Sequence, residues 1–233
     1  MTYPIEKRLM SGLPNERLDS VKYVIAHESG NPNNCGPNAL ENEIAYMNRN
    51  KANAFTSHWV GGGGRVVQIA PVNRVQYGCG PKGNPLSYAQ VELARTNDKE
   101  QFKKDYAAYI WLLRELAKEA GIPVVLDGAG NGIKSHRWIT DNLKGTTHRD
   151  PYDYLASMGI TEAQFKLDIL NGLEEVKGAQ ITKAKVMLND NKTIPAVIID
   201  GRTHVQVRDI ADLLNLKLVY NNESKITKLY EVK

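Results

Sequence analysis

The stretch "AQVELARTNDKEQFKKDYAAYIWLLRELAKEAGIPVVLD", residues 89–127, holds three patterns in succession. Residues 89–94 alternate between apolar and polar side chains, which predicts a strand with Gln90 and Glu92 on one face. Between residues 97 and 120, apolar side chains recur at the spacing of an amphipathic helix. Residues 122–127 are again mostly apolar and predict a second strand. Strands that alternate with helices favour an α/β fold, in which helices pack on a sheet.

The helix at the centre of this stretch has start and stop signals. Asn97, with Glu100 three residues later, resembles a capping box. Gly121 follows the last apolar position and predicts the helix end.

Outward from this unit, the same periodicities predict further elements. Residues 21–27, "VKYVIAH", indicate a short buried strand that ends on His27. Residues 56–70, "TSHWVGGGGRVVQIA", predict two strands joined by a turn at Gly61–Gly64, and no Gly-Lys-Ser/Thr follows that would indicate a phosphate-binding loop. Thr161 and Gln164 predict the start of another helix, which extends to about Val176.

After residue 177 the pattern changes to short strands, one helix and a final hairpin. Turn pairs Asp190-Asn191 and Asp200-Gly201 separate the strands. We therefore expect a domain boundary near residues 175–180, with one domain over 1–177 and a small α+β module over 178–233.

Composition excludes several classes of protein. The chain has 233 residues, of which 42% are hydrophobic and 24% charged, as in ordinary globular proteins. Its apolar runs are too short for a membrane span. The net charge is +4, and residues 178–233 hold nine Lys or Arg against six Asp or Glu, but no basic run or aromatic series indicates nucleic-acid binding. Two cysteines, Cys35 and Cys79, are too few for a disulfide framework, and the sequence leaves open whether they pair.

Three side chains could form a metal site. His27 at a predicted strand end, His136 and Asp150 offer imidazole nitrogen and carboxylate oxygen, which zinc accepts, and a catalytic zinc keeps a fourth position for water. Such chemistry also requires a base and a donor for the developing oxyanion, for which Glu92 and His148 are candidates. His58 and His204 are interpreted as structural or surface residues.

Five segments, in order, carry a resemblance to a known family. They are "YVIAHESGN", "SHWVGGGGRVVQIAP", "QYGCGPKGNPLSYAQVELA", "GIKSHRWITDNLKGTTHRDPYDYL" and "GITEAQF". Over residues 18–170 the chain resembles the zinc-dependent N-acetylmuramoyl-L-alanine amidases of the bacteriophage-lysozyme and peptidoglycan-recognition-protein group, especially those of autolysins and endolysins. The resemblance implies a mixed central sheet flanked by helices.

The resemblance also implies roles for individual residues. His27, His136 and Asp150 would be the zinc ligands, Glu92 would activate the water, and His148 would polarise the scissile carbonyl or stabilise its oxyanion. Many relatives have cysteine at the position of Asp150 and lysine at that of His148, so the protonation state of His148 stays open. Tyr77 and Asn84, which precede the Glu92 strand, are candidates to line the substrate groove or to serve only in packing and a turn.

These implications define the expected function. The enzyme would hydrolyse the amide between N-acetylmuramic acid and L-alanine in bacterial peptidoglycan, in a Gram-positive wall. A zinc endopeptidase that cuts within the stem peptide, or a non-catalytic peptidoglycan-binding protein, are the alternatives.

The start of the chain and its last quarter add two expectations. The first residues lack the pattern of a secretory signal, which favours a phage or prophage endolysin, made in the host cytoplasm and acting on the wall after release. Residues 183–233 resemble the small repeat domain at the N-terminus of some copper amine oxidases and in wall-associated proteins. This resemblance implies wall binding or formation of a homodimer, without copper, whereas an inert stabilising cap is the alternative.

Overall fold

The computed structural model describes residues 2–173, 182–188, 192–199, 202–221 and 226–231. The chain divides into two compact units, Met1–Glu174 and Glu175–Lys233. Each unit is described by itself.

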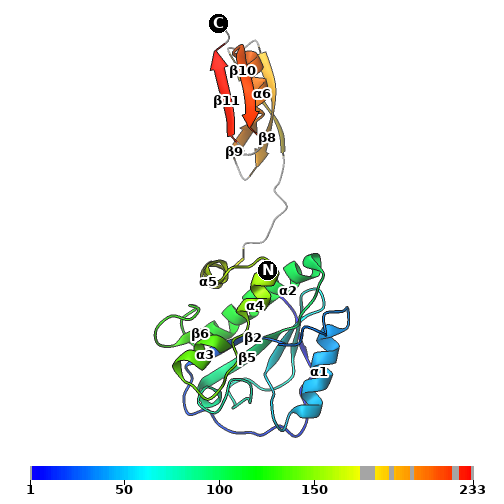
Figure 1. Cartoon of the computed structure of the whole chain (residues 1–233), viewed down its shortest axis with the longest axis vertical. Helices are drawn as coiled ribbons and strands as arrows, with labels where there is room; N and C mark the ends of the chain where they lie inside the picture. The colour runs from blue at the N-terminus through cyan, green and yellow to red at the C-terminus, as the bar shows by residue number, and fades with distance from the viewer. Residues whose placement is uncertain (1, 174–181, 189–191, 200–201, 222–225, 232–233) are drawn as a thin grey trace. The chain divides into compact units, whose positions relative to one another are not determined.

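The first unit is built on one six-stranded sheet with the strand order β1-β4-β3-β5-β2-β6 (Figure 1). Strands β3 and β4 form an antiparallel hairpin, and all other neighbours are parallel, so the sheet is mixed as expected. The strands are β1 (Ile5–Lys7), β2 (Tyr23–Glu28), β3 (His58–Gly61), β4 (Arg65–Gln68), β5 (Ser87–Leu93) and β6 (Gly132–Ser135).

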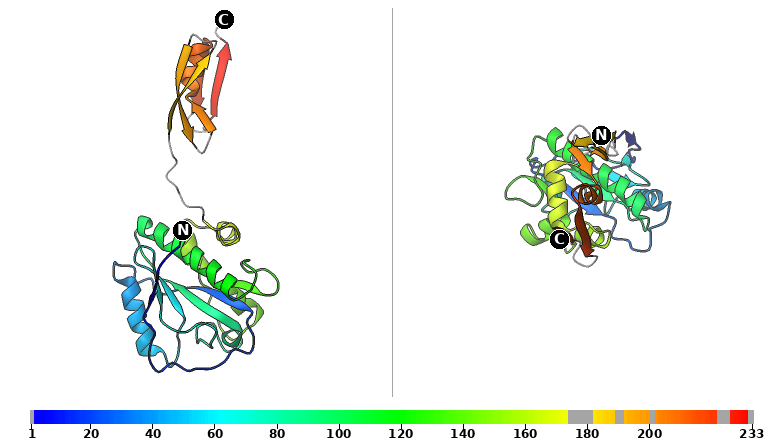
Figure 2. Two further views of the ribbon diagram at one scale, coloured as in Figure 1. Left: turned by 180° about the vertical axis from the view of Figure 1, so that it is seen from behind. Right: turned by 90° about the horizontal axis from the view of Figure 1, so that it is seen from above.

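Helices cover both faces of this sheet. The longest, α2, runs across one face and contacts all strands from β2 to β6, as Figures 1 and 2 show from opposite sides. The helices of the unit are α1 (Ala39–Asn50), α2 (Lys99–Glu119), α3 (His136–Asn142), α4 (Tyr152–Ser157) and α5 (Glu162–Asn171), with a short 3₁₀ turn η1 (Asn84–Leu86). The mixed α/β class predicted from the sequence is confirmed.

Alternation along the strands assigns side chains to the two faces. In β2, Val24 and Ala26 belong to the large core cluster that includes α2, whereas Ile25 packs with Ile139 of α3. In β3, Val60 faces the α2 side and Trp59 packs against α1 on the other. Apolar side chains thus fill both faces, and burial of this area is the main stabilising contribution.

Several predicted elements have different bounds. Asp98, not Asn97, caps α2, because its side chain accepts from the backbone amides of Glu100 and Gln101. The helix that begins after Thr161 ends at Asn171, with Gly172 at φ 80°, and does not reach Val176. The bounds expected for β2, the β3–β4 hairpin and the Gly121 stop are confirmed within two residues.

The strand predicted at residues 122–127 is wrong. This segment makes a single bridge, Leu126 to Ile133, and the edge strand is β6, which follows it. The chain returns so closely that a Cβ on Gly132, at φ 144°, would lie 2.8 Å from the Val125 carbonyl oxygen. Only glycine fits there, because it has no Cβ.

The second unit has the expected order of short strands, one helix and a hairpin. Strands β7, β8 and β9 form one antiparallel sheet, β10 and β11 form another, and α6 packs on β10. Their bounds are β7 (Thr182–Leu188), β8 (Lys192–Ile199), β9 (Arg202–Val205), α6 (Val207–Leu213), β10 (Leu216–Asn221) and β11 (Ile226–Glu231). The turns predicted at Asp190-Asn191 and Asp200-Gly201 lie outside the described residues.

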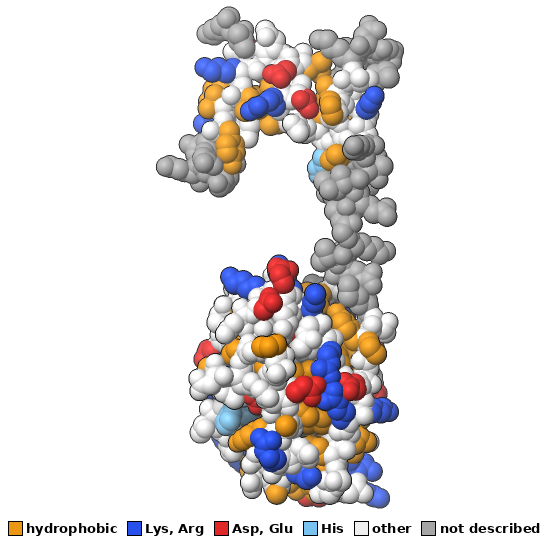
Figure 3. All heavy atoms as spheres, turned by 90° about the vertical axis from the view of Figure 1, so that its right-hand side faces the viewer, with side chains coloured by type: hydrophobic (Ala, Val, Ile, Leu, Met, Phe, Trp, Pro, Cys, Tyr) orange, Lys and Arg blue, Asp and Glu red, His pale blue; other side chains and the backbone are white. Residues whose placement is uncertain are grey.

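On the face drawn in Figure 3, acidic and basic side chains of the first unit are interspersed. No helix in the described part of the chain is both long and apolar enough to cross a membrane. Cys35 and Cys79 are free thiols, the latter buried.

Candidate metal centre and substrate groove

The sheet places His27 and Glu92 side by side. They are register partners on the parallel strands β2 and β5. Both point to the face opposite α2, because their neighbours Ala26 and Val91 belong to the α2 core. Two ionisable side chains therefore share one end of the sheet face.

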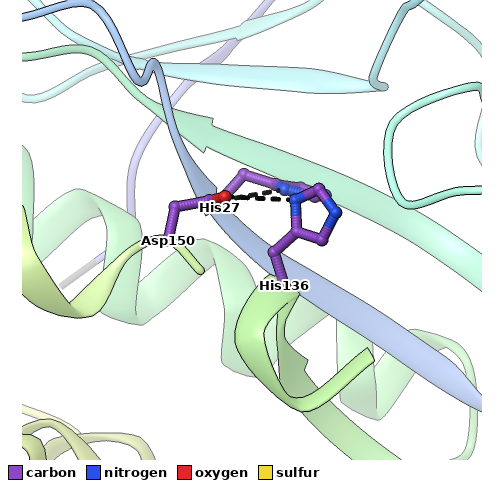
Figure 4. A group of neighbouring side chains, drawn as sticks. All are labelled: His27, His136 and Asp150. Carbon is purple, nitrogen blue, oxygen red and sulfur yellow. Dashed lines mark hydrogen bonds and ion pairs between the residues drawn. The ribbon is translucent and has the colours of Figure 1, made fainter. Parts of the chain in front are cut away.

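Asp150 joins His27 to His136. His136 is the first residue of α3, directly after β6, and Asp150 precedes α4. The Asp150 carboxylate lies 3.1 Å from Nδ1 of His27 through Oδ2 and 3.1 Å from Nδ1 of His136 through Oδ1, as Figure 4 shows. The three ligand atoms all lie within 4.8 Å of one another, so they could hold one metal ion.

The protonation states of this group suit metal binding. Burial opposes ionisation of Asp150, but hydrogen bonds from His136 and His27 outweigh it and hold the pKa of the carboxyl below its usual range. Burial lowers the pKa of His136, and the neighbouring carboxylate opposes this only in part. An ionised carboxylate and a neutral imidazole are the forms that coordinate a cation.

The far nitrogen of each imidazole is also held. Nε2 of His27 lies 3.1 Å from Oε1 of Gln90, a side chain with no exposed surface. Nε2 of His136 lies 3.0 Å from Oγ1 of Thr146. A hydrogen bond at the far nitrogen fixes the ring orientation, so that Nδ1 faces Asp150 and could coordinate a metal ion held with it.

Glu92 lies beside this group, and one of its carboxylate oxygens is buried and unpaired among the described residues. It is 9% exposed, and its Oε2 has no hydrogen-bond partner among the described residues. Burial, and then the negative charge of Asp150 and other nearby carboxylates, raise the pKa of Glu92 well above its usual range. A buried carboxyl group with a raised pKa is a candidate for the acid and base steps of a reaction.

His148 lies on the open side of the centre. Its ring stacks on His136 with centroids 4.9 Å apart, and its side chain is 71% exposed. Its Nδ1 is 3.9 Å from Asp150, and its carbonyl accepts from the Thr140 hydroxyl. The side chain can therefore reach a molecule that lies over the centre.

The three candidate ligands, Glu92 and His148 all line one open groove of about 1250 Å³. Tyr77 and Asn84 line it as well. Tyr77 packs edge-on against Phe55, with centroids 5.1 Å apart, and its hydroxyl bonds to Glu16. Oδ1 of Asn84 accepts from the Cys79 amide at 2.9 Å and the Gln90 amide group at 3.3 Å, so this oxygen holds the groove wall together.

The remaining histidines lie elsewhere. His58 is 1% exposed and faces the α2 side of the sheet, where burial lowers its pKa to about 3. His204 is exposed in the second unit.

Two partners of the metal centre were not predicted from the sequence. For Gln90, the polar position next to Glu92 in the alternating strand was an available signal. For Thr146, which contacts a histidine ten residues before it in the chain, no local pattern exists.

Comparison with known proteins identifies the family of this chain. A family model for N-acetylmuramoyl-L-alanine amidase, Amidase_2, matches residues 17–153. The endolysin of Listeria phage A511 is 43% identical over 99% of this chain, which spans 67% of that protein. The lytic amidase of Streptococcus pneumoniae phage HB-3 is 43% identical over 74% of this chain and 54% of its own length. The chain therefore spans about two thirds of the first relative and about half of the second.

Solved structures share the fold. The hydrolase AmiA of Staphylococcus aureus, solved in complex with its ligand, matches with a TM-score of 0.66 and 25% identity, over 73% of this chain and 83% of that one. PlyL matches with a TM-score of 0.55 and 20% identity, over 73% of this chain and 99% of that one. With the family match over more than half of its length, the chain belongs to the N-acetylmuramoyl-L-alanine amidase family.

Proposed function

We propose that the first unit hydrolyses the amide between the lactyl group of N-acetylmuramic acid and L-alanine in bacterial peptidoglycan, with zinc as cofactor. The observation that carries this proposal is the convergence of His27, His136 and Asp150 beside Glu92, in a chain of this family. The endolysin and lytic amidase relatives agree with action on the cell wall.

The donor set fits zinc. Two imidazole nitrogens and one carboxylate oxygen are ligands that zinc accepts, and three protein ligands leave one coordination position open. When bound, zinc acts as a Lewis acid that lowers the pKa of water and polarises a carbonyl group. The side chains of Gln90 and Thr146 would hold the ligand rings in place.

The chain's own side chains would handle the protons and the developing charge. Glu92, with its raised pKa, would accept a proton from the attacking water and return it to the nitrogen of L-alanine as the C–N bond breaks. His148 would donate a hydrogen bond to the carbonyl oxygen as negative charge develops there. Its exposure and its stacking on His136 support this position over the substrate.

Mass spectrometry of peptidoglycan digested by the full chain tests the reaction. We expect free stem peptides that begin with L-alanine, loss of their release after chelation, and recovery on addition of zinc. Peptides cut within the stem would indicate the endopeptidase, and binding without products would indicate a non-catalytic protein. Full activity in a preparation shown by elemental analysis to be metal-free would exclude the zinc site.

For the whole protein we propose a phage or prophage endolysin, made in the host cytoplasm and acting on the wall after release. Its relatives from two phages support this origin. The second unit would then bind the wall or form a homodimer. Its share of the positive charge in the sequence supports wall binding, because Gram-positive walls are anionic.

A further inference from the structure

The groove is lined by many carboxylate side chains. Among the described residues that line it, Arg17 is the one lysine or arginine. The carboxylates that line it are Glu16, Asp19, Glu28, Glu92 and Asp150. Such a groove repels a negatively charged substrate unless a cation offsets the field.

The backbone of Arg17 is fixed to the groove wall on both sides. The Glu16 carbonyl accepts from the amide of Val75 at 3.0 Å. The amide of Asp19 donates to the Pro85 carbonyl at 2.9 Å. The Glu16 side chain is bound as well, by the hydroxyl of Tyr77. The segment that presents Arg17 is therefore anchored before any substrate binds.

The Arg17 side chain itself has no ion-pair or hydrogen-bond partner among the described residues, and it is exposed. Of the carboxylates that line the groove, Glu28 binds Arg95 through two contacts, at 2.6 and 2.7 Å. Asp150 faces His27 and His136. An anchored arginine that faces a groove without a partner in the protein is free to pair with a ligand.

We propose that Arg17 is a specificity-determining residue that binds a free carboxylate of the peptidoglycan stem peptide. The inference rests on the proposed amidase function. A stem peptide carries such groups at its second residue, where D-glutamate has a free or amidated α-carboxyl, and at a third-residue diaminopimelate. The planar guanidinium pairs with a carboxylate through two parallel hydrogen bonds and gains nothing comparable from an amide.

Soluble muropeptides that differ in one group test this role in the full chain with zinc bound. One pair contrasts D-glutamate with D-isoglutamine at the second residue, and the other contrasts diaminopimelate with its amide at the third. In the wild type we expect a higher kcat/KM for the acid of one pair, expressed mainly in KM. In Arg17→Gln that ratio should fall about fivefold, the value for a partly exposed ion pair. In Arg17→Glu the preference should reverse.

Arg49→Gln is the matched control. Arg49 is also an exposed arginine, it lies on α1 outside the groove, and its loss changes the net charge equally. Its acid-to-amide ratio should equal that of the wild type. A wild-type ratio of one in both pairs, or an unchanged ratio in a folded Arg17→Gln protein, would overturn the role of Arg17. If the wild type released no peptide beginning with L-alanine from any muropeptide, the proposed reaction itself would be wrong.

Discussion

At the scale of single residues, the burial of Glu92 lowers the stability of the folded protein at a position where the proposed reaction requires a base. A buried carboxyl is costly to ionise when, as for Oε2 of Glu92, an oxygen has no hydrogen-bond partner among the described residues. The pKa of Glu92 is raised in the folded protein, so the folded state binds this proton more tightly than the unfolded chain. The resulting stabilisation is complete below the unfolded pKa of about 4.3 and is lost as the pH rises through the folded pKa. The wild-type protein therefore carries this cost at neutral pH.

Glu92→Gln should separate stability from activity. Without metal, the variant should unfold at a higher temperature than the wild type at pH 7–8, and the difference should shrink toward pH 4. With zinc, turnover should fall roughly 10²–10⁴-fold through loss of the base. Thermal scans over pH and peptide release measure the two effects. A variant that is less stable at every pH would contradict the assignment of Glu92 as an unsatisfied buried acid.

Thr146→Val tests the support of the metal centre. The substitution keeps the side-chain shape but removes the hydroxyl that faces Nε2 of His136. Loss of such a partner typically weakens metal affinity about 10–100-fold. Chelator competition should show this weakening for Thr146→Val and little change for Thr147→Val. Thr147 is the adjacent threonine in the groove, and among the described residues its side chain makes no hydrogen bond to a ligand ring. Equal zinc affinity in both variants would remove Thr146 from this role.

At the scale of elements, the start of α2 depends on Asp98. Its carboxylate accepts from two backbone amides, 2.8 Å from that of Glu100 and 3.2 Å from that of Gln101. Asp98→Ala should lower the free energy of unfolding by about 1 kcal/mol, as for other caps. Asn97→Ala, at the exposed position that the sequence favoured, should change it by less than about 0.5 kcal/mol. Denaturant unfolding compares the two, and an effect of equal size would contradict the observed cap.

The same element shows what sequence could and could not predict. Helix α2 follows from its apolar period, but its first residue does not, since Asn97 and Asp98 are both good capping residues. The strand at residues 122–127 failed for a different reason. An apolar run predicts burial, whereas strand formation depends on a partner, and β2 pairs with the short segment Gly132–Ser135 instead.

The metal centre could likewise be predicted from the sequence only in part. His27 could be placed because it ends an apolar strand, and Glu92 because its strand alternates. The meeting of His27, His136 and Asp150 depends on sheet order, since β2 lies between β5 and β6. No local pattern contains that order, so residue types alone could suggest the three as a possible metal site, and their assignment as ligands depended on the family resemblance.

At the scale of the whole molecule, the residues proposed for catalysis all precede Pro151, within the first compact unit. The second unit adds nine basic and six acidic residues over 178–233 in the sequence. We therefore expect it to raise the local concentration of enzyme at an anionic wall without a part in bond cleavage.

A protein that ends at Lys177 tests this division of labour. It should retain zinc and cleave small soluble muropeptides at close to the full-length rate, because the groove and its anchors lie before that point. Its affinity for purified walls should fall by roughly tenfold or more, since a second binding contact is lost. The difference from the full chain should shrink at high salt, because added ions screen the charges of the tail. Wall pull-down across salt concentrations measures this, and equal binding by both proteins would refute wall targeting.

Light scattering tests the alternative role of the second unit. A full chain that is dimeric and a shortened chain that is monomeric would assign the second unit to dimer formation. The loss of wall affinity would then reflect the loss of a dimer in which two catalytic units act on one surface.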